Sequence, residues 1–301
     1  MATIKPTLRQ LHIFQEVAKR GNFTRASESL HLSQPAVSIQ VRQLEKAVGL
    51  PLFEQLGKKI YLTEPGEALY AAAQNIGHAL EDISEVVDEF KGHKRGRLSV
   101  SVASTAGSFA TRILAGFARL YPEVSISLDV TNRERLLEQL DANECDLAIM
   151  GRPPADRDLD YRPFMDNPLV IVSAPDHPFA GRKAIPVTEL QRKAFVVREP
   201  GSGTRAAARR FFDEHGVVVQ FAMEMTGNES IKQAVQAGLG LAVASRHTLE
   251  LELETGRLVM LDVEGFPIMR HWYLVQRKGK RLSPVARMFE SFVLETGAEY
   301  K

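Results

Sequence analysis

The chain has 301 residues, 44% of them hydrophobic and 25% charged, so it is long enough for about two domains with their own cores and is neither disordered nor fibrous. Its net charge of +1 is unevenly distributed, because residues 1–63 hold nine Lys/Arg and four Asp/Glu, a net of +5, and the remainder has a net of −4. The single cysteine, Cys145, excludes an intramolecular disulfide, and the lack of an apolar run of ~18 residues and of a signal-peptide core predicts a cytoplasmic protein without a membrane partner.

The basic N-terminal segment has the pattern of a winged helix-turn-helix. Apolar residues at helical spacing predict a first helix over residues 8–20. Two shorter helical patterns follow, and the second begins at Ser33, whose hydroxyl can cap the helix, with Pro35 in the first turn. Residues 52–62 then predict a β-hairpin wing with two lysines near its tip.

The second helix of this motif is predicted to present a polar face to DNA. One apolar face is formed at helical spacing by Val37, Val41, Leu44 and Val48, so the polar residues around them project from the other. Glutamine can pair with an adenine edge, and arginine can reach guanine or phosphate. The alternative is a small helical domain whose polar face is only solvated. The predicted DNA-binding residues are Thr24, Arg25, Ser33, Gln34, Pro35, Ser38, Ile39, Arg42, Lys58 and Lys59.

A family resemblance is carried by residues 30–45, which read LHLSQPAVSIQVRQLE, together with Leu52-Phe53 and Leu62-Thr63. This pattern resembles the DNA-binding domain of LysR-type transcriptional regulators, and the resemblance extends over the whole chain. It implies double-stranded promoter DNA as the partner and allows a further contact with RNA polymerase. Many members carry arginine where Ile39 stands, so their base preference cannot be transferred to this chain.

A long helix is predicted over residues 67–90. A heptad seam is formed by positions that alternate steps of four and three, namely Leu69, Ala73, Ile76, Leu80, Ile83, Val87 and Phe90. On periodicity alone, this seam could instead pack on the second domain of its own chain. The resemblance implies a linker-helix homodimer that presents two recognition helices to a two-fold related operator and assembles further into a homotetramer.

The remaining residues alternate strands and helices, which predicts a parallel sheet with covering helices. Strands are predicted over residues 98–103, 124–130, 145–150, 169–173, 194–197, 220–225, 241–244 and 271–276, and helices over 109–121, 132–143, 204–215, 229–238 and 284–294. We expect the last strand and helix to return to the first half, so that two α/β lobes are joined near residues 164–167 and 263–269. This arrangement resembles the periplasmic-binding-protein-like effector domain of LysR-type regulators.

The predicted domains are therefore an N-terminal all-α winged helix-turn-helix (residues 1–63), a linker or dimerisation helix (64–93) and a two-lobed α/β effector-binding domain (94–301). Lobe I is expected to comprise about 94–164 and 268–301, and lobe II about 165–267.

A ligand site is predicted where the strands end, because ligands of such sheets bind beyond the carboxyl ends of the strands. The segment Gly201-Ser202-Gly203-Thr204-Arg205 opens a helix whose N–H groups attract an anion, and Arg205 could add a guanidinium fork. The alternative is a loop with a well-capped helix and no ligand. Arg152 and Asn228 could equally be a surface charge and a helix cap. The predicted effector-binding residues are Ser104, Thr105, Arg152, Gly201, Ser202, Gly203, Thr204, Arg205 and Asn228.

Four segments, over residues 50–55, 164–169, 174–178 and 198–205, resemble the CbbR-type branch, which activates RuBisCO and other carbon-fixation operons. That resemblance implies an anionic effector such as a phosphorylated metabolite or a nucleotide. Regulators of nitrogen, sulfur and aromatic-acid genes share much of this cleft, so another pathway remains an alternative. A DNA-tethered hydrolase and a solute-binding protein are further alternatives. The chain has no P-loop, no GxSxG elbow, no HExxH and no metal-ligand cluster, so we predict no catalytic residue, metal or cofactor.

Overall fold

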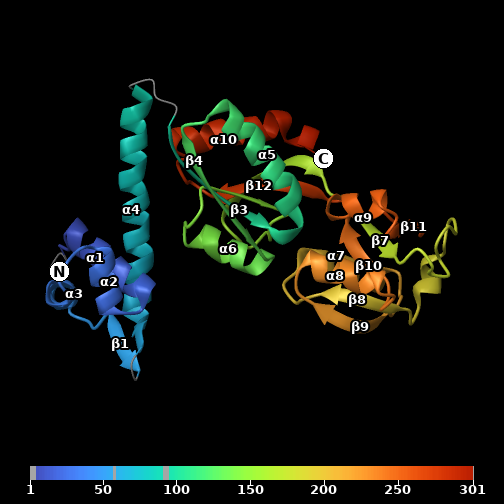
Figure 1. Cartoon of the computed structure of the whole chain (residues 1–301), viewed down its shortest axis with the longest axis horizontal. Helices are drawn as coiled ribbons and strands as arrows, with labels where there is room; N and C mark the ends of the chain where they lie inside the picture. The colour runs from blue at the N-terminus through green and yellow to red at the C-terminus, as the bar shows by residue number, and fades with distance from the viewer. Residues whose placement is uncertain (1–4, 57–58, 91–94, 301) are drawn as a thin grey trace. The chain divides into compact units, whose positions relative to one another are not determined.

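The computed structural model describes residues 5–56, 59–90 and 95–300, and of residues 78, 81, 82 and 84–90 it describes only the backbone. The chain divides into two compact units, which meet in sequence between Ser84 and Glu85 (Figure 1). Within the described residues, every helix is too short or too polar to cross a membrane.

The N-terminal unit contains three short helices and a hairpin, as predicted. The helices are α1 (Leu8–Arg20), α2 (Phe23–Ser29) and α3 (Gln34–Val48), and the strands β1 (Phe53–Leu56) and β2 (Lys59–Leu62) pair antiparallel. The side chains of Thr7, Asn22 and Ser33 each accept a hydrogen bond from a backbone N–H in the first turn of the helix that follows. These caps set where each helix begins.

The wing is fixed to the helices by both packing and hydrogen bonds. The ring of Phe53 lies 5.2 Å from that of Phe14 and 5.9 Å from that of Phe23. The Glu45 carboxylate on α3 accepts hydrogen bonds from the backbone N–H groups of Leu52, at 2.9 Å, and Phe53, at 3.4 Å. The wing and α3 therefore hold a defined position relative to each other.

The long helix α4 (Glu64–Phe90) begins at Glu64, the first residue of the predicted linker helix. The first positions of its heptad seam pack within the N-terminal unit, where Ala73 is buried and Leu69 is half-buried against the same core. Farther along, Ile76 and Ile83 are 40% and 61% exposed. The side chains of Val87 and Phe90 lie outside the described residues. The seam is thus shared between the unit's own core and an exposed apolar stripe.

Lobe I is built on a five-stranded sheet of order β4-β3-β5-β12-β6 (Figure 1). The strands are β3 (Gly96–Ala103), β4 (Val124–Thr131), β5 (Leu147–Met150), β6 (Leu159–Asp166) and β12 (His271–Arg277). The sheet contributes to two hydrophobic cores. Helices α5 (Gly107–Leu120) and α10 (Pro284–Thr296) pack in one of them, and α6 (Arg133–Asp141) packs in the second.

The return of the last strand and helix to lobe I is confirmed, but the prediction of a purely parallel sheet is wrong. Strand β12 comes back from lobe II and runs antiparallel to both β5 and β6. Strand β6 was not predicted from the sequence. It contains Pro163 and its residues are mostly exposed, so it lacks the apolar pattern of a core strand.

Lobe II holds an antiparallel sheet of order β10-β7-β11 and a parallel β8-β9 pair. The strands are β7 (Leu169–Ser173), β8 (Ala194–Arg198), β9 (Gln220–Met225), β10 (Ala242–Ser245) and β11 (Val259–Leu261). Alternate residues of β7 enter two different cores, one shared with α7 (Gly203–Glu214) and the other with α8 (Asn228–Gln236). The short elements β11 and α9 (Glu250–Glu254) were not predicted, because three and five residues are too few to show a period.

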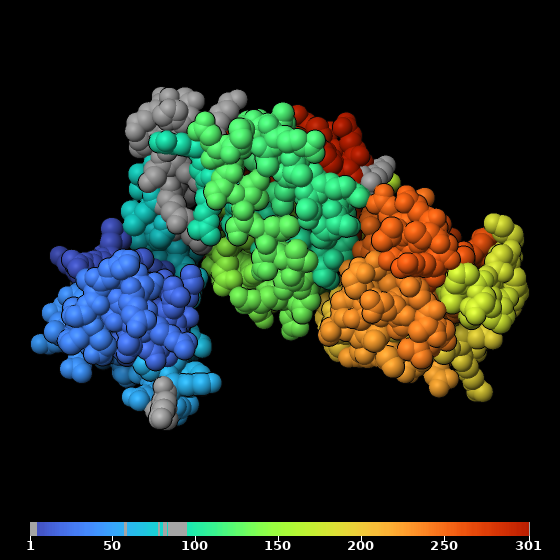
Figure 2. All heavy atoms as spheres, in the orientation of Figure 1, coloured from blue at the N-terminus to red at the C-terminus, as the bar shows by residue number. Residues whose placement is uncertain are grey.

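The chain passes between the lobes twice, along two segments that lie side by side. The backbone N–H of Asn167 donates to the carbonyl of Arg270 at 2.7 Å, and Leu169 bridges Ile268 in antiparallel register. Figure 2 shows the two lobes meeting along a narrow seam. The carboxyl ends of β3, β4 and β5 therefore face lobe II across a cleft, where the cavity described below lies.

Candidate functional site

The polar face of α3 has the exposure that reading DNA requires. Gln34, Pro35 and Arg42 are exposed and Ile39 is 51% exposed, whereas Ser38 is half-buried. On the opposite face, Val37, Val41 and Leu44 are buried, as predicted.

The residues predicted to flank this face are also accessible where the structure describes them. Thr24 and Arg25 are exposed on α2, Ser33 is exposed at the cap, and Lys59 is exposed at the start of β2. Lys58 lies outside the described residues. The N-terminal unit thus presents a helix face and a wing with hydrogen-bonding and basic groups, which is the set that contacts base edges and phosphates.

In the second unit, three polar side chains form a hydrogen-bonded cluster across the cleft, and we call Ser104, Arg198 and Asn228 the inter-lobe latch. Ser104 follows β3 in lobe I. The Arg198 guanidinium of lobe II donates to Ser104 Oγ at 3.1 Å and to Asn228 Oδ1 at 2.5 Å. Asn228 Nδ2 in turn donates to the Ser104 carbonyl at 3.1 Å. The predicted residues Ser104 and Asn228 are therefore brought together from different lobes.

Arg198 is held in place by its neighbour in sequence. Its side chain is 6% exposed and donates two 2.7 Å hydrogen bonds to the Glu199 carboxylate. Burial would raise the pKa of Glu199, but the hydrogen bonds and charge of Arg198 outweigh it, so the pKa lies below its ordinary value. This pair neutralises the charge of Arg198 inside the protein.

Beside the latch lies a small cavity of about 30 Å³. Ser202 caps α7 by accepting from the Arg205 N–H, which leaves the start of α7 directed at the cavity. Five of the predicted residues are at this helix start or opposite it. The lining includes Ser104, Thr105, Asn132, Arg133, Gly151, Asn167, Arg198, Ser202, Gly203, Thr204 and Arg270.

Two arginines of this cavity, Arg133 and Arg270, were not predicted. Arg133 is the first residue of α6 and donates to the carbonyl of Arg152 at 2.8 Å. Arg270 lies in a segment between the lobes and donates to the carbonyl of Gly203 at 2.9 Å. Burial lowers the pKa of both, and for Arg270 the positive charges of Arg133 and Arg210 lower it further. Among the described residues, neither guanidinium forms an ion pair.

Three of the predicted effector residues lie elsewhere. Arg205 does not line the cleft cavity, because its guanidinium turns back to the Arg198 carbonyl, at 2.7 Å, and to Glu224. Arg152 reaches the site only through its carbonyl. Gly201 has a φ of +83° and lies beside Glu134, outside the cavity lining. The proposed anion fork of Arg205 is thus not supported by its position.

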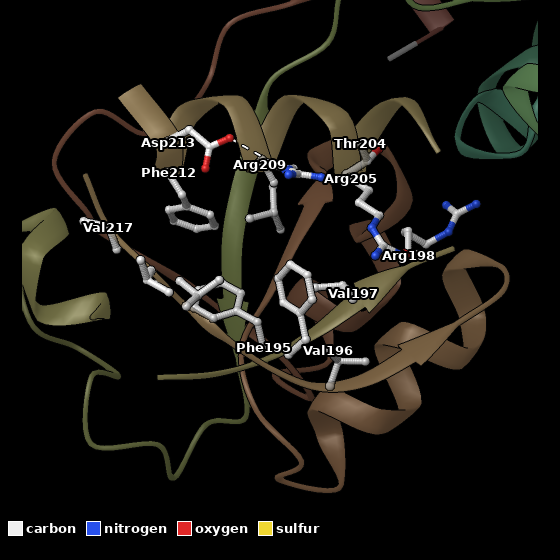
Figure 3. Close-up of a pocket in the computed structure, with 15 residues that line it drawn as sticks. Phe195, Val196, Val197, Arg198, Thr204, Arg205, Arg209, Phe212, Asp213 and Val217 are labelled. Atoms are coloured by element: carbon white, nitrogen blue, oxygen red, sulfur yellow. Dashed lines mark hydrogen bonds and ion pairs between the residues drawn. The ribbon is translucent and has the colours of Figure 1, made fainter. Parts of the chain in front are cut away.

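Arg205 instead belongs to a larger cavity of about 350 Å³ within lobe II, between α7 and the β8-β9 pair (Figure 3). Its walls are mostly apolar, and Figure 3 shows Phe195 on the strand and Phe212 on the helix facing the same space. Arg205, Arg209 and Asp213 of α7 also line it. The guanidinium of Arg205 lies over the ring of Phe221, 5.5 Å from its centroid. This side of α7 therefore carries both apolar and charged side chains, and the cleft side is polar and cationic.

Two of the cavity residues that were not predicted, Asn132 and Arg133, could have been found from the sequence. Asn132 and Arg133 stand at the turn from β4 to α6, at the same sheet edge as Ser104. The rule that located Ser104 would have located them, since parallel strands end at one edge. Arg270 follows directly on the predicted inter-lobe segment, but its direction depends on the fold of both lobes and has no signal in the sequence.

Comparisons with known proteins agree with this architecture. Residues 8–67 match the bacterial regulatory helix-turn-helix protein, lysR family, and residues 91–298 match the LysR substrate binding domain. A RuBisCO operon transcriptional regulator of Allochromatium vinosum is 53% identical over 292 residues, covering 97% of each chain. The transcriptional regulator CbbR of Rhodospirillum rubrum is 45% identical and covers 95% of each chain.

Among solved structures, the regulatory domain of CcmR from Synechocystis PCC6803, in complex with 2-PG, has 43% identity and a TM-score of 0.65. The match covers 67% of this chain and 97% of that one. Both halves of the chain are thus matched by LysR models, and relatives with more than 30% identity cover nearly all of it. The chain therefore belongs to the LysR family of DNA-binding transcriptional regulators, in the branch that contains regulators of RuBisCO operons.

Proposed function

We propose that this LysR-type regulator of carbon-fixation genes activates transcription when a small phosphorylated metabolite occupies the cleft between its lobes. The observation that carries the proposal is the convergence of three guanidinium groups, of Arg133, Arg198 and Arg270, beside the start of α7. Only Arg198 has a carboxylate partner among the described residues, so the cleft has a surplus of positive charge. An anion is the ligand that such a surplus favours.

The related CcmR domain supports a phosphorylated ligand, because its structure contains 2-phosphoglycolate. The two lobes line the cleft cavity from opposite sides, so their separation would admit a ligand and their closure would hold it. Binding would shift the population toward the closed arrangement, since a ligand can shift an equilibrium only through its different affinity for the two states.

For the DNA-binding unit, we assign base contacts to Gln34, Ser38 and Ile39 on α3, and phosphate contacts to Arg42 and the lysines of the wing. The other predicted contacts, from Thr24, Arg25, Ser33 and Pro35, surround the start of α3. Glutamine reads adenine in the major groove, and isoleucine can contact a thymine methyl. Phosphate contacts do not depend on sequence and make affinity fall with salt.

We assign dimerisation to α4, on which Ile76 and Ile83 form an exposed apolar stripe. Two chains joined there would present two α3 helices to a two-fold related operator, and the family resemblance extends this to a homotetramer. Such a regulator works in the cytoplasm on chromosomal DNA, where an activator also meets RNA polymerase. Its relatives are transcriptional regulators, and we accordingly assign it no enzymatic activity.

The test is a DNA-binding titration with a RuBisCO operon promoter fragment from the same genome, with and without 2-phosphoglycolate. We expect specific binding at physiological salt and a change in affinity or in DNA bending when 2-phosphoglycolate is added. Binding that is equal on promoter and random DNA would refute the regulatory assignment. Promoter binding that no phosphorylated metabolite alters would refute the effector assignment.

A further inference from the structure

We propose that Arg133 and Arg270 form a receptor for the phosphoryl group of the effector, and that Arg270 conveys its occupancy to the segment joining the lobes. The inference rests on the proposed function, because it names the chemistry that the same cleft selects. Beyond the proposed function, it assigns Arg133 and Arg270 to ligand binding, specifies a doubly charged phosphoryl group, and links ligand binding to the segment between the lobes.

The two side chains converge on one point of the cleft. An ideal Cβ at Gly203, the first residue of α7, would lie 3.8 Å from Cδ of Arg133 and 3.8 Å from Nη2 of Arg270. A Cβ at Gly151 would lie only 2.6 Å from the same Nη2 of Arg270. The guanidinium of Arg270 is therefore packed closely between the ends of β5 and α7, next to Arg133.

Within the part of the chain that the structure describes, each arginine uses one donor and has others left. The contacts that fix them are single hydrogen bonds to carbonyls, from Arg133 to Arg152 and from Arg270 to Gly203. The charged group that acts most strongly on Arg270 is Arg133, a like charge, and Arg210 on α7 adds a second. Two cations held together in a partly buried cleft are unfavourable unless an anion binds between them.

Charge and geometry favour a phosphoryl group over a carboxylate. A phosphoryl dianion balances two guanidinium charges, and its three terminal oxygens can accept from two arginine forks and from the N–H groups at the start of α7. A carboxylate has one charge and two oxygens, so it would leave one of the cations unbalanced. The nearby carboxylates of Glu199 and Glu134 do not change this count, since Glu199 is paired with Arg198 and Glu134 is exposed beside Gly201.

The three contributors belong to different moving parts. Arg133 is on lobe I, the α7 start is on lobe II, and Arg270 is next to the inter-lobe bridge at Ile268. A phosphoryl group that bonds all three gains its full binding energy only when the lobes are closed. Its binding therefore selects the closed arrangement, and Arg270 is the group through which the joining segment responds.

The test is calorimetry on the intact protein with three probes. These are 2-phosphoglycolate, glycolate, which lacks the phosphoryl group, and malonate, which keeps two negative charges as carboxylates. We expect 2-phosphoglycolate to bind most tightly. Arg133→Gln and Arg270→Gln should each weaken 2-phosphoglycolate roughly 10- to 100-fold, the range of one charge-assisted hydrogen bond, and leave glycolate nearly unchanged.

The matched control is Arg210→Gln, which removes an exposed positive charge from α7 outside the cavity and should change the affinity by less than about threefold. Arg270→Lys keeps the positive charge but not the forked guanidinium, so it should give an intermediate loss of affinity. It also provides a test of Arg270 if Arg270→Gln does not fold. Equal loss for 2-phosphoglycolate and glycolate, or no binding of 2-phosphoglycolate to the wild type, overturns the inference.

The coupling role has its own readout in solution scattering. In the wild type, 2-phosphoglycolate should reduce the radius of gyration of the protein, whereas saturated Arg270→Lys should show a smaller change. A full change in that variant overturns the coupling role. If 2-phosphoglycolate binds through these arginines but leaves promoter binding unaltered, the proposed function fails and the receptor stands.

Discussion

The guanidinium group of Arg198 in lobe II donates a 3.1 Å hydrogen bond to Oγ of Ser104 in lobe I. This bond crosses the cleft at the edge of the cationic cavity, so one polar contact both joins the lobes and lines the candidate effector site. Arg198 is also paired with Glu199, so we expect it to keep its place in lobe II when the Ser104 bond opens. The latch is thus a means by which a ligand in the cavity can alter the closure of the lobes.

Ser104→Ala should loosen the closed arrangement. The substitution removes the acceptor Oγ but keeps the carbonyl that binds Asn228, so we expect a loss of one hydrogen bond, about 1 kcal/mol. Effector affinity should fall roughly two- to tenfold, since part of the binding energy is then used to close the lobes. Calorimetry with 2-phosphoglycolate measures this, with Ser127→Ala on an exposed position of β4 as the control. An unchanged affinity would show that the latch does not contribute to closure.

Glu199→Gln should change the dependence of stability on pH. The pKa of Glu199 is lowered in the folded protein, so its carboxylate stabilises the fold above its ordinary pKa of 4.5, and this contribution disappears as the pH falls through the lowered value. Below about pH 4.5 the melting temperature of the wild type should therefore drop, while the variant starts lower at neutral pH and loses less on acidification.

The control for this experiment is Glu189→Gln. The pKa of Glu189 is also lowered, by hydrogen bonds from Arg182, but the pair is at the surface, where solvent and salt weaken it. We expect little effect of this variant on the melting temperature at any pH. A drop equal to that of Glu199→Gln would mean that burial of the Arg198 pair has no special role.

The elements of this fold that could be predicted from the sequence are those with a strong local sequence pattern. The cap at Ser33 and the apolar spacing from Val37 to Leu44 predicted the start and the buried face of α3, because both act within a single helix. The antiparallel course of β12 could not be read in the same way, since its direction is set by where the chain re-enters lobe I. Very short elements such as β11 also lacked a period to detect.

The candidate site was predicted in part for the same reason. Ser202 and Thr204 were found because a helix start has a local pattern, and both lie at the cavity. Arg205 has the right charge, but its side chain points to the opposite side of α7, where the Arg198 carbonyl and Glu224 bind it. Arg270 approaches from more than sixty positions later in the sequence, so only the tertiary fold brings it to Gly203.

Two substitutions in the DNA-binding unit should separate base reading from phosphate binding. Gln34→Ala removes an exposed side chain at the start of α3 and should lose about 1–3 kcal/mol of discrimination between operator and mismatched DNA. Lys59→Ala on the wing should weaken all DNA similarly and reduce the slope of log affinity against log salt by about one. Fluorescence anisotropy over a salt series distinguishes the two. Equal losses on specific and random DNA for Gln34→Ala would contradict its assignment.

Ile83→Asp should disrupt the dimer that we assign to α4. Ile83 is 61% exposed in the single chain, and burying such a side chain contributes roughly 1.5–3 kcal/mol on each chain. Aspartate would lose that contribution and place like charges opposite each other on a two-fold axis, so the dimer dissociation constant should rise at least about 100-fold. Ile83→Leu keeps an apolar side chain and should preserve the dimer. Sedimentation velocity at low micromolar concentration measures both variants. If Ile83→Asp stays dimeric, the chains must pair through another surface, and the exposed stripe of α4 would then need a different partner to explain it.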